Sequence, residues 1–370
     1  MGRRSWWFRI NIIMAEFKIN SITDRSGYCG PVIAGVSTNN STGCMIIPAG
    51  PTEHRGGRGR AVFSGGYTHS APTYHIGNVM QFVQISTLGN TADFGDAVVT
   101  ASVRGTAASA TIGLFAGGYN TSSNAIDFVI MSSGGGSLDW GDLSSDVTHG
   151  SQRYLPMGLS NITRGYFVGG TKAGGSFNQY QNIDLVNFSS KGNTSIFGFL
   201  NKRRGQGGSF ASSTRGVFGG GRTADPDVEP DNTIDFITLS TSGEETKFGD
   251  LTAARSGSVS GASSSTRGLF TGGLVAPLAA ANVSDIMDYV TIATQSNAID
   301  FGNLTAGRVV GSSSNNIRAI NAGGFVSSAL VNTIDYVTIA TTGNAQDFGD
   351  LSTAGSHMNH CSDAHGGLIQ

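Results

Sequence analysis

Residues 332–351 have the sequence Asn-Thr-Ile-Asp-Tyr-Val-Thr-Ile-Ala-Thr-Thr-Gly-Asn-Ala-Gln-Asp-Phe-Gly-Asp-Leu. The first half is rich in β-branched and aromatic residues, and a Gly-Asn pair separates it from the second half. This pattern predicts two β-strands joined by a turn. Copies of the stretch begin near Asn232 and Asp285, and looser ones near Met80, Asn124 and Asn182. The stretch is therefore one copy of a repeated unit.

A short apolar run that ends in Gly-Gly marks the period of the repeat. Its central position is taken in turn by Phe63, Phe115, Phe167, Phe218, Phe270 and Asn321. Successive positions are 51 or 52 residues apart. A regular period of this size is the signature of propellers and other repeat architectures.

Each unit contains four predicted strands. In chain order they are a Gly/Ser-rich strand that often opens with Arg, the strand that ends in Gly-Gly, an apolar strand with an internal Asp, and a strand around a Phe-Gly-Asp corner. Four antiparallel strands that bury both faces against neighbouring units form a propeller blade. We therefore predict an all-β propeller, in which Gly and Ser suit the crowded inner strands and the corner aromatic wedges between adjacent blades.

The number of blades depends on how the ends of the chain close the ring. Residues 357–362 match the Gly/Ser-rich strand, and residues 365–369 match a truncated Gly-Gly strand. An N-terminal hairpin with strands at 31–38 and 43–48 is predicted to supply the missing partners. We therefore predict seven blades, one of them built from both termini. The alternative is six blades, in which only the 357–362 strand closes the first.

Composition limits the domain organisation and the function. Charged residues make up only 13% of the chain and the net charge is −2, which excludes a strongly basic nucleic-acid surface. The apolar run in residues 1–13 is broken and too short for membrane insertion. These residues are either an extra N-terminal arm or a start assigned too early, because Met14 begins a natural start. Residues 14–58 are predicted to be a strand segment for ring closure or docking, and residues 59–370 the propeller.

The repeat resembles the kelch repeat over residues 60–370. The match rests on the Gly-Gly end, the apolar-Asp-aromatic strand, the corner aromatic and the Arg that opens the next unit. Only Trp140 keeps the kelch Trp, which is mostly Phe here. Residues 22–27, 50–60, 291–302, 338–349 and 365–368 together resemble kelch-like virion proteins of tailed phages that infect marine bacteria, notably cyanobacteria. This resemblance implies a virion protein, assembled in the host cytoplasm, whose partners are other virion proteins or copies of itself.

The recurring Asp residues resemble a set of catalytic acids in the sequence. They occur once per blade, however, and active sites are usually asymmetric, so we predict a structural role for them. We predict that Asp127, Asp184, Asp235, Asp288 and Asp335 accept hydrogen bonds from the backbone or from Arg164, Arg215, Arg267 or Arg318 of the neighbouring strand. A second candidate cluster, His357, His360, Cys361 and His365, does not share one face of a strand, whereas zinc needs four convergent ligands. We therefore predict no metal, no cofactor and no catalytic residues.

Recognition is predicted to lie in the loops after each Gly-Gly, which vary while their flanks repeat. Varied loops on a rigid scaffold are where binding residues usually lie. The predicted binding residues are Tyr67, Tyr74, His75, Tyr119, Phe177, Tyr180, Asp225, Asp227, Glu229 and Asp231. The leading hypothesis is a non-enzymatic phage tail or fibre protein that binds proteins or a host-surface glycan or receptor. The alternatives are a kelch-type interaction module unrelated to a virion and a carbohydrate-active enzyme.

Overall fold

The computed structural model divides the chain into two compact units, residues 1–51 and 52–370. The structure describes residues 37–38, 45–46, 59–68, 75–119, 124–145, 153–172, 179–223, 230–241, 243–257, 259–278, 282–326 and 329–368. In the first unit, β1 (Ser37–Thr38) pairs antiparallel with β2 (Met45–Ile46). The predicted N-terminal hairpin is confirmed in these residues, and the segment 1–13 lies outside the described residues.

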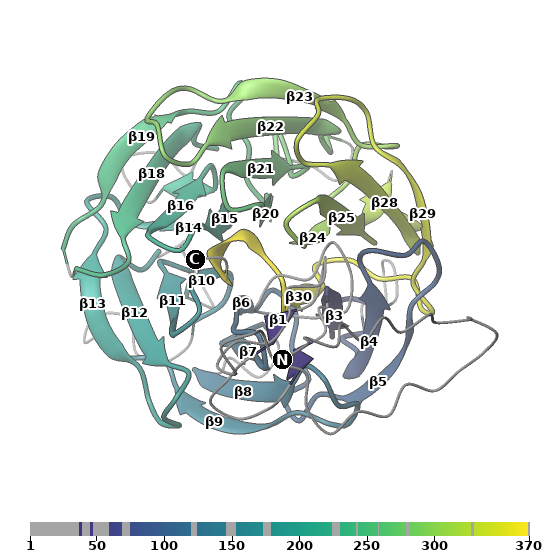
Figure 1. Cartoon of the computed structure of the whole chain (residues 1–370). Helices are drawn as coiled ribbons and strands as arrows, with labels where there is room; N and C mark the ends of the chain where they lie inside the picture. Colours follow the sequence, from purple (N-terminus) through teal and green to yellow (C-terminus); the bar gives the residue numbers. More distant parts are fainter. Residues whose placement is uncertain are drawn as a thin grey trace, which may run out of the picture. The chain divides into compact units, whose positions relative to one another are not determined.

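The second unit is a β-propeller, whose described residues form six blades of four antiparallel strands. Figure 1 shows the inner strand of each blade near the axis and the outer strand at the periphery. Blade I contains β30 (Asn359–Ser362), β3 (Arg60–Ser64), β4 (Val79–Gln84) and β5 (Ala92–Asp96), from the axis outward. Blade II contains β6 (Gly105–Ala108), β7 (Ile112–Ala116), β8 (Ala125–Ile130) and β9 (Leu138–Asp142). Blade III contains β10 (Met157–Ser160), β11 (Arg164–Val168), β12 (Asn182–Asn187) and β13 (Ser195–Phe199).

The other three blades follow the same order. Blade IV contains β15 (Gly208–Ala211), β16 (Arg215–Gly219), β18 (Thr233–Thr238) and β19 (Thr246–Asp250). Blade V contains β20 (Ser260–Ser263), β21 (Arg267–Thr271), β22 (Ile286–Thr291) and β23 (Ile299–Asn303). Blade VI contains β24 (Gly311–Ser314), β25 (Arg318–Ala322), β28 (Thr333–Thr338) and β29 (Gln346–Asp350). Short pairs, β14 (Arg204–Gly205) with β17 (Arg222–Thr223) and β26 (Phe325–Val326) with β27 (Ala329–Leu330), lie outside the blades.

The ring closes in blade I, where the last strand of the chain pairs with the first strand of the propeller. Cys361 of β30 lies opposite Val62 of β3 in an antiparallel register. The alternative prediction of six blades, closed by the 357–362 strand, is therefore confirmed. The prediction of seven blades was wrong, since β1 and β2 pair with each other in a separate two-stranded sheet.

The segment after β30 also differs from its prediction as a strand. It forms a 3-10 turn, Gly366–Leu368, which contacts the inner strands β10, β15 and β20. A Cβ on Gly366 or Gly367 would lie 2.0 Å from the carbonyl oxygen of Ser264 or Ser160 respectively. Glycine therefore allows the chain to turn in close contact with the inner strands. We call residues 363–368 the C-terminal plug.

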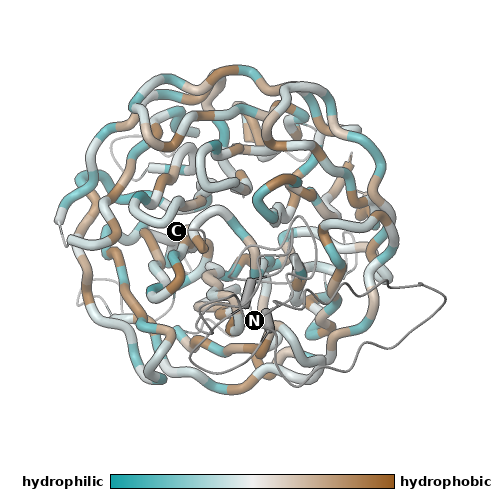
Figure 2. The backbone as a smooth tube through the Cα atoms, viewed as in Figure 1, coloured by the Kyte–Doolittle hydropathy of each residue, from teal (hydrophilic) through white to brown (hydrophobic). Residues whose placement is uncertain are grey.

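The hydrophobic core is divided into clusters that each lie between two adjacent blades. Phe94 of blade I, for example, is buried with Phe115, Val129 and Met131 of blade II. Trp140 of blade II likewise packs with Phe167 of blade III. Apolar residues are accordingly spread around the whole ring (Figure 2). The predicted wedge of the corner aromatic between blades is confirmed, and it explains why Phe or Trp recurs at this position.

The glycine of each corner allows the next blade to approach. At the seam between blades VI and I, a Cβ on Gly349 would lie 2.4 Å from the carbonyl oxygen of Gly89. The Gly89 N–H donates to the carbonyl oxygen of Phe348 at 3.0 Å. Gly349 has a φ of +147°, which side-chain-bearing residues rarely adopt. The Phe-Gly-Asp corner is thus the point where the periphery of one blade is hydrogen-bonded to the next.

Among the described residues, no helix is long and apolar enough to cross a membrane.

Candidate functional site

The residue that follows each Gly-Gly lies on a rim around one end of the propeller. At this residue the chain leaves the second strand of a blade. In five blades the residue also forms a β-bridge with the loop that leads into an inner strand. These bridges are Tyr67↔Ser356, Ser102↔Tyr119, Tyr154↔Thr171, Gly205↔Arg222 and Ser256↔Leu274. The equivalent residue of blade VI is Phe325 in β26. The rim positions are therefore Tyr67, Tyr119, Thr171, Arg222, Leu274 and Phe325. Equivalent backbone positions carry unlike side chains, which is expected where a scaffold is fixed and its surface is varied.

Within the rim, aromatic side chains gather on neighbouring blades. The His357 ring stacks on Phe325 with centroids 5.8 Å apart and meets the Tyr67 ring edge-on at 5.5 Å. Tyr119, which is 44% exposed, contacts Tyr154 at 5.7 Å. Burial, followed by the neighbouring Tyr119, raises the pKa of Tyr154, so its hydroxyl stays protonated at neutral pH. We call these five residues the aromatic arc.

The inner strands surround a cavity of about 130 Å³. Its lining includes eight Ser and four Gly residues, several apolar side chains, and His357, His360 and His365. The C-terminal plug bounds one end, where His365 Nε2 lies 3.0 Å from the Ala108 carbonyl oxygen and the Gly367 N–H donates to Nδ1. His360 Nε2 lies 3.1 Å from the Ser260 hydroxyl. Burial lowers the pKa of both imidazoles to about 4, so these two cavity residues are neutral at neutral pH.

The predicted binding residues have different positions. Tyr67 and Tyr119 are rim residues, and His75 is exposed in the loop that follows Tyr67. Asp231 accepts hydrogen bonds from the Thr233 N–H and hydroxyl. Burial alone would raise the Asp231 pKa, but these hydrogen bonds and the Arg204 charge hold it below its usual value. Tyr74, Phe177, Asp225, Asp227 and Glu229 lie outside the described residues.

Tyr180 requires a correction, because its side chain is fully buried. The Arg153 guanidinium lies over its ring at 5.3 Å, so Tyr180 belongs to the scaffold rather than to a recognition surface. Sequence reasoning also missed Tyr154, Phe325 and His357 of the aromatic arc. Phe325 could have been predicted from the sequence, because it follows Gly323-Gly324 just as Tyr67 follows Gly65-Gly66.

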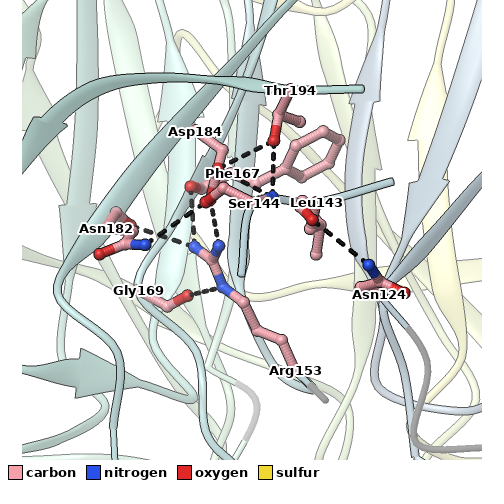
Figure 3. Close-up of polar contacts among 9 residues, drawn as sticks. All are labelled: Asn124, Leu143, Ser144, Arg153, Phe167, Gly169, Asn182, Asp184 and Thr194. Atoms are coloured by element: carbon pink, nitrogen blue, oxygen red, sulfur yellow. Dashed lines mark hydrogen bonds and ion pairs between the residues drawn. The ribbon is translucent and has the colours of Figure 1, made fainter. Parts of the chain in front are cut away.

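The recurring acids lie inside the blades and pair with buried arginines (Figure 3). Arg153 pairs with Asp184 of blade III, and the side chains are 1% and 0% exposed. The other pairs in the described residues are Arg104–Asp127, Arg204–Asp235, Arg255–Asp288 and Arg308–Asp335. In blade III the arginine precedes the inner strand, so the pair ties the entrance of that strand to the third strand of the same blade.

The predicted arginine partners of these acids were therefore wrong, and the strand register explains why. The predicted backbone donors are confirmed for Asp184 and Asp335, which accept from the N–H groups of Ser144 and Thr305. Asp184 lies opposite Phe167, whereas Arg164 lies at the other end of β11 opposite Asn187. The arginines at the start of the second strands instead link neighbouring blades. Arg215 lies over the Phe236 ring at 4.6 Å and donates to the carbonyl oxygens of Ile292 and Ala293 in the next blade.

Arg153 and Asp184 make further hydrogen bonds, all of them to groups inside the propeller. Arg153 donates to the carbonyl oxygens of Gly169, Phe167 and Asn182 at 2.5, 3.1 and 3.1 Å (Figure 3). Asp184 accepts from the Thr194 hydroxyl at 2.9 Å and from the Ser144 N–H at 3.3 Å. These contacts satisfy the charges where water has no access, which fits the predicted structural role of the acids.

In blade I, neutral hydrogen-bonding groups take the place of the buried ion pair. Gln81 replaces the Asp, and its side-chain oxygen accepts from the Thr91 hydroxyl at 2.6 Å and from the Ser352 N–H at 2.9 Å. No ion pair links its inner strand to β4 among the described residues. The ring-closing blade therefore depends on backbone pairing, apolar packing and neutral side-chain hydrogen bonds, such as the one that the Asn359 amide donates to the Ser64 carbonyl oxygen at 2.9 Å.

Blade IV contains a second buried acid, Glu245, which accepts a hydrogen bond from the Asn201 N–H at 2.8 Å. Burial, followed by the nearby charge of Asp235, raises its pKa from 4.5 to about 7. The folded protein thus holds a proton that the unfolded chain releases between these values, so the free energy of unfolding falls as pH rises through this window.

We expect Glu245→Gln to remove this pH dependence and to stabilise the protein above neutral pH. The gain is on the order of 1–3 kcal/mol, because the amide carries no charge to desolvate and its oxygen still accepts from Asn201. Chemical denaturation at several pH values between 4.5 and 8 measures it, with exposed Glu244→Gln as the control. Parallel stability profiles for wild type and Glu245→Gln would contradict this account.

Comparison with protein-family models and with curated proteins finds no match for this chain. The geometry must therefore be interpreted from its own residues. Across the described ranges, no group of three or more His, Cys, Asp or Glu side chains is placed to hold a metal ion. The feature that distinguishes one blade from another is the rim, and we treat the rim with its aromatic arc as the candidate site.

Proposed function

We propose that this protein is a non-enzymatic binding protein that recognises its ligand through the rim. The observation that carries the proposal is the rim itself, where five of the six equivalent positions present partly exposed Tyr, Arg, Leu or Phe side chains, while Thr171 is fully buried. A catalytic array is disfavoured, because the recurring acids are held in buried ion pairs rather than directed at a substrate.

The aromatic arc favours a glycan or glycan-bearing receptor as the ligand. Aromatic rings present flat apolar faces with a polar edge, and such faces pack against the C–H faces of sugar rings. Tyr119 is 44% exposed and Tyr67 and Tyr154 are half-buried, so their rings are partly accessible in the free protein. The neutral imidazoles of the cavity favour hydroxyl groups over strongly charged ligands.

We further propose that the protein is a kelch-like tail or fibre component of a phage virion that mediates host attachment. The support is the resemblance of residues 22–27, 50–60, 291–302, 338–349 and 365–368 to virion proteins of phages of marine cyanobacteria. Detection of the protein in purified particles by mass spectrometry, and its position by labelled antibodies, tests this role. Absence from particles would favour an interaction module unrelated to a virion.

Tyr119→Ala is expected to weaken binding to host cells or to a glycan-array ligand by roughly tenfold, the loss expected from removing one stacking ring. Tyr67→Ala should have a similar effect. Leu88→Ala is the matched control, because Leu88 is 58% exposed but lies in the turn before β5, away from the rim. Equal binding by wild type and both tyrosine variants would refute recognition by the arc, and turnover of the glycan would favour the enzyme alternative.

A further inference from the structure

We propose that the outer edge of blade III is the surface on which this protein docks a second copy of itself. The edge is strand β13, which pairs with β12 on one side and is the outermost strand of its sheet. An outer strand is a template for pairing with another chain unless its side chains prevent it. The side chains of the equivalent strands therefore show which edges are protected.

The edges of the other blades carry polar side chains at two equivalent positions, and at least one of the two is charged on every edge. The second residue of the strand is Asp93, Asp139, Lys247, Asp300 or Asp347. The fifth residue is Asp96, Asp142, Asp250, Asn303 or Asp350. Charged side chains on edge strands disfavour edge-to-edge association, because edges of like charge repel each other. The edges that carry Asp are thus protected from pairing with one another.

Strand β13 lacks this protection at both positions. Ile196 and Phe199 occupy them, and their side chains are 44% and 47% exposed. Among the six described outer strands, β13 alone has no ionisable side chain. Phe199 stands where the other corners carry Asp or Asn, and nearly half of its side chain remains in water after packing in its own blade. Burial in a contact explains a Phe at this position.

The charges around β13 indicate the partner surface. Lys191 precedes the strand and Lys202 follows it, and both are exposed. Strands β5, β9, β23 and β29 each carry one or two Asp side chains at the two edge positions and no basic residue. An apolar edge flanked by cations is therefore complementary to an acidic edge of another copy, and it repels itself. A second copy supplies such edges on several blades.

This pairing joins two different surfaces of the molecule, so it is heterologous. A heterologous contact leaves the acidic edges of one copy and the β13 edge of the other free, and it builds chains or rings rather than a two-fold dimer. The contact is independent of the rim, because the outer strands lie at the periphery of the blades (Figure 1). Loss of ligand binding and loss of self-association are therefore separable.

Sedimentation velocity of the full chain over a range of concentrations tests the proposal. We expect wild-type protein to form species larger than a dimer, and high salt to weaken them because the contact includes charge pairs. Phe199→Asp and Ile196→Asp should each raise the concentration needed for association by roughly tenfold or more. Both substitutions place Asp where equivalent strands already carry it, so the fold should tolerate them, and thermal unfolding checks this.

The matched control is Ile317→Asp. Ile317 is 40% exposed and precedes β25, the second strand of blade VI, so it lies on no outer strand. This variant should associate like wild type. A wild-type protein that stays monomeric at every soluble concentration would overturn the proposal. So would a closed dimer, or association that Phe199→Asp leaves unchanged or that Ile317→Asp weakens equally.

Discussion

Asp184→Ala is expected to lower the free energy of unfolding by about 3–5 kcal/mol, because it leaves the Arg153 guanidinium buried without its counter-charge. Arg153 is 1% exposed and lies between the ends of the second and third strands of blade III. Water therefore cannot replace the carboxylate without local opening of the blade. Denaturant-induced unfolding followed by far-UV circular dichroism measures the loss.

Two further variants distinguish this effect from a general sensitivity to acid removal. Asp139→Ala removes an exposed acid of the outer strand β9 and should change stability by less than about 0.5 kcal/mol. The double substitution Arg153→Met with Asp184→Leu removes both charges and should recover most of the loss, because well-packed apolar side chains can replace a buried ion pair. If Asp184→Ala behaved like Asp139→Ala, the structural role of the recurring acids would be refuted.

A chain that ends after Ala354 is expected to lose most of the stability of the propeller. This truncation removes β30, and with it Cys361 and Met358 from the two clusters that join blade I to its neighbours. It also leaves the inner edge of β3 unpaired. The expected loss is comparable to the roughly 5–15 kcal/mol that stabilises an ordinary domain. Thermal unfolding and the yield of soluble protein measure it.

A shorter truncation, after Asp363, is the matched control. It keeps β30 and removes most of the C-terminal plug, including buried Leu368. The expected cost is about 1.5–3 kcal/mol, the value of one buried leucine side chain. A synthetic peptide of residues 355–370 added to the longer truncation should restore a cooperative unfolding transition. Equal stability of the two truncated chains would show that β30 does not close the ring.

The strands of each blade could be predicted from the sequence, but the arginine partners of the buried Asp residues could not. The Phe-Gly-Asp corner predicted an aromatic wedge between blades, and Phe94 and Trp140 confirm it. The Arg–Asp pairing was predicted from adjacency of strands, yet Arg164 and Asp184 lie at positions three residues apart in register. Register depends on the bulge and turns of each strand, which sequence distance does not specify.

The candidate site was only partly predictable for a similar reason. Tyr67 and Tyr119 follow Gly-Gly in the sequence and were found by that rule, whereas Tyr154 and His357 precede inner strands of other repeats. They join the aromatic arc only because each loop pairs with the rim. Tyr180 was predicted to be a binding residue because it lies in a loop after Gly-Gly, but its side chain is buried beneath the Arg153 guanidinium.

The sequence by itself determined that this protein is a propeller of four-stranded blades. The strand and corner motifs of each blade are local properties that adjacent residues specify, and their repetition every 51 or 52 residues can be read along the chain. Only the tertiary structure decided the blade number, because closure depends on whether β30 meets β3 and on the turn that follows it. It also decided which unlike side chains share one rim and which edge lies unprotected, because these depend on bringing separate repeats around one axis.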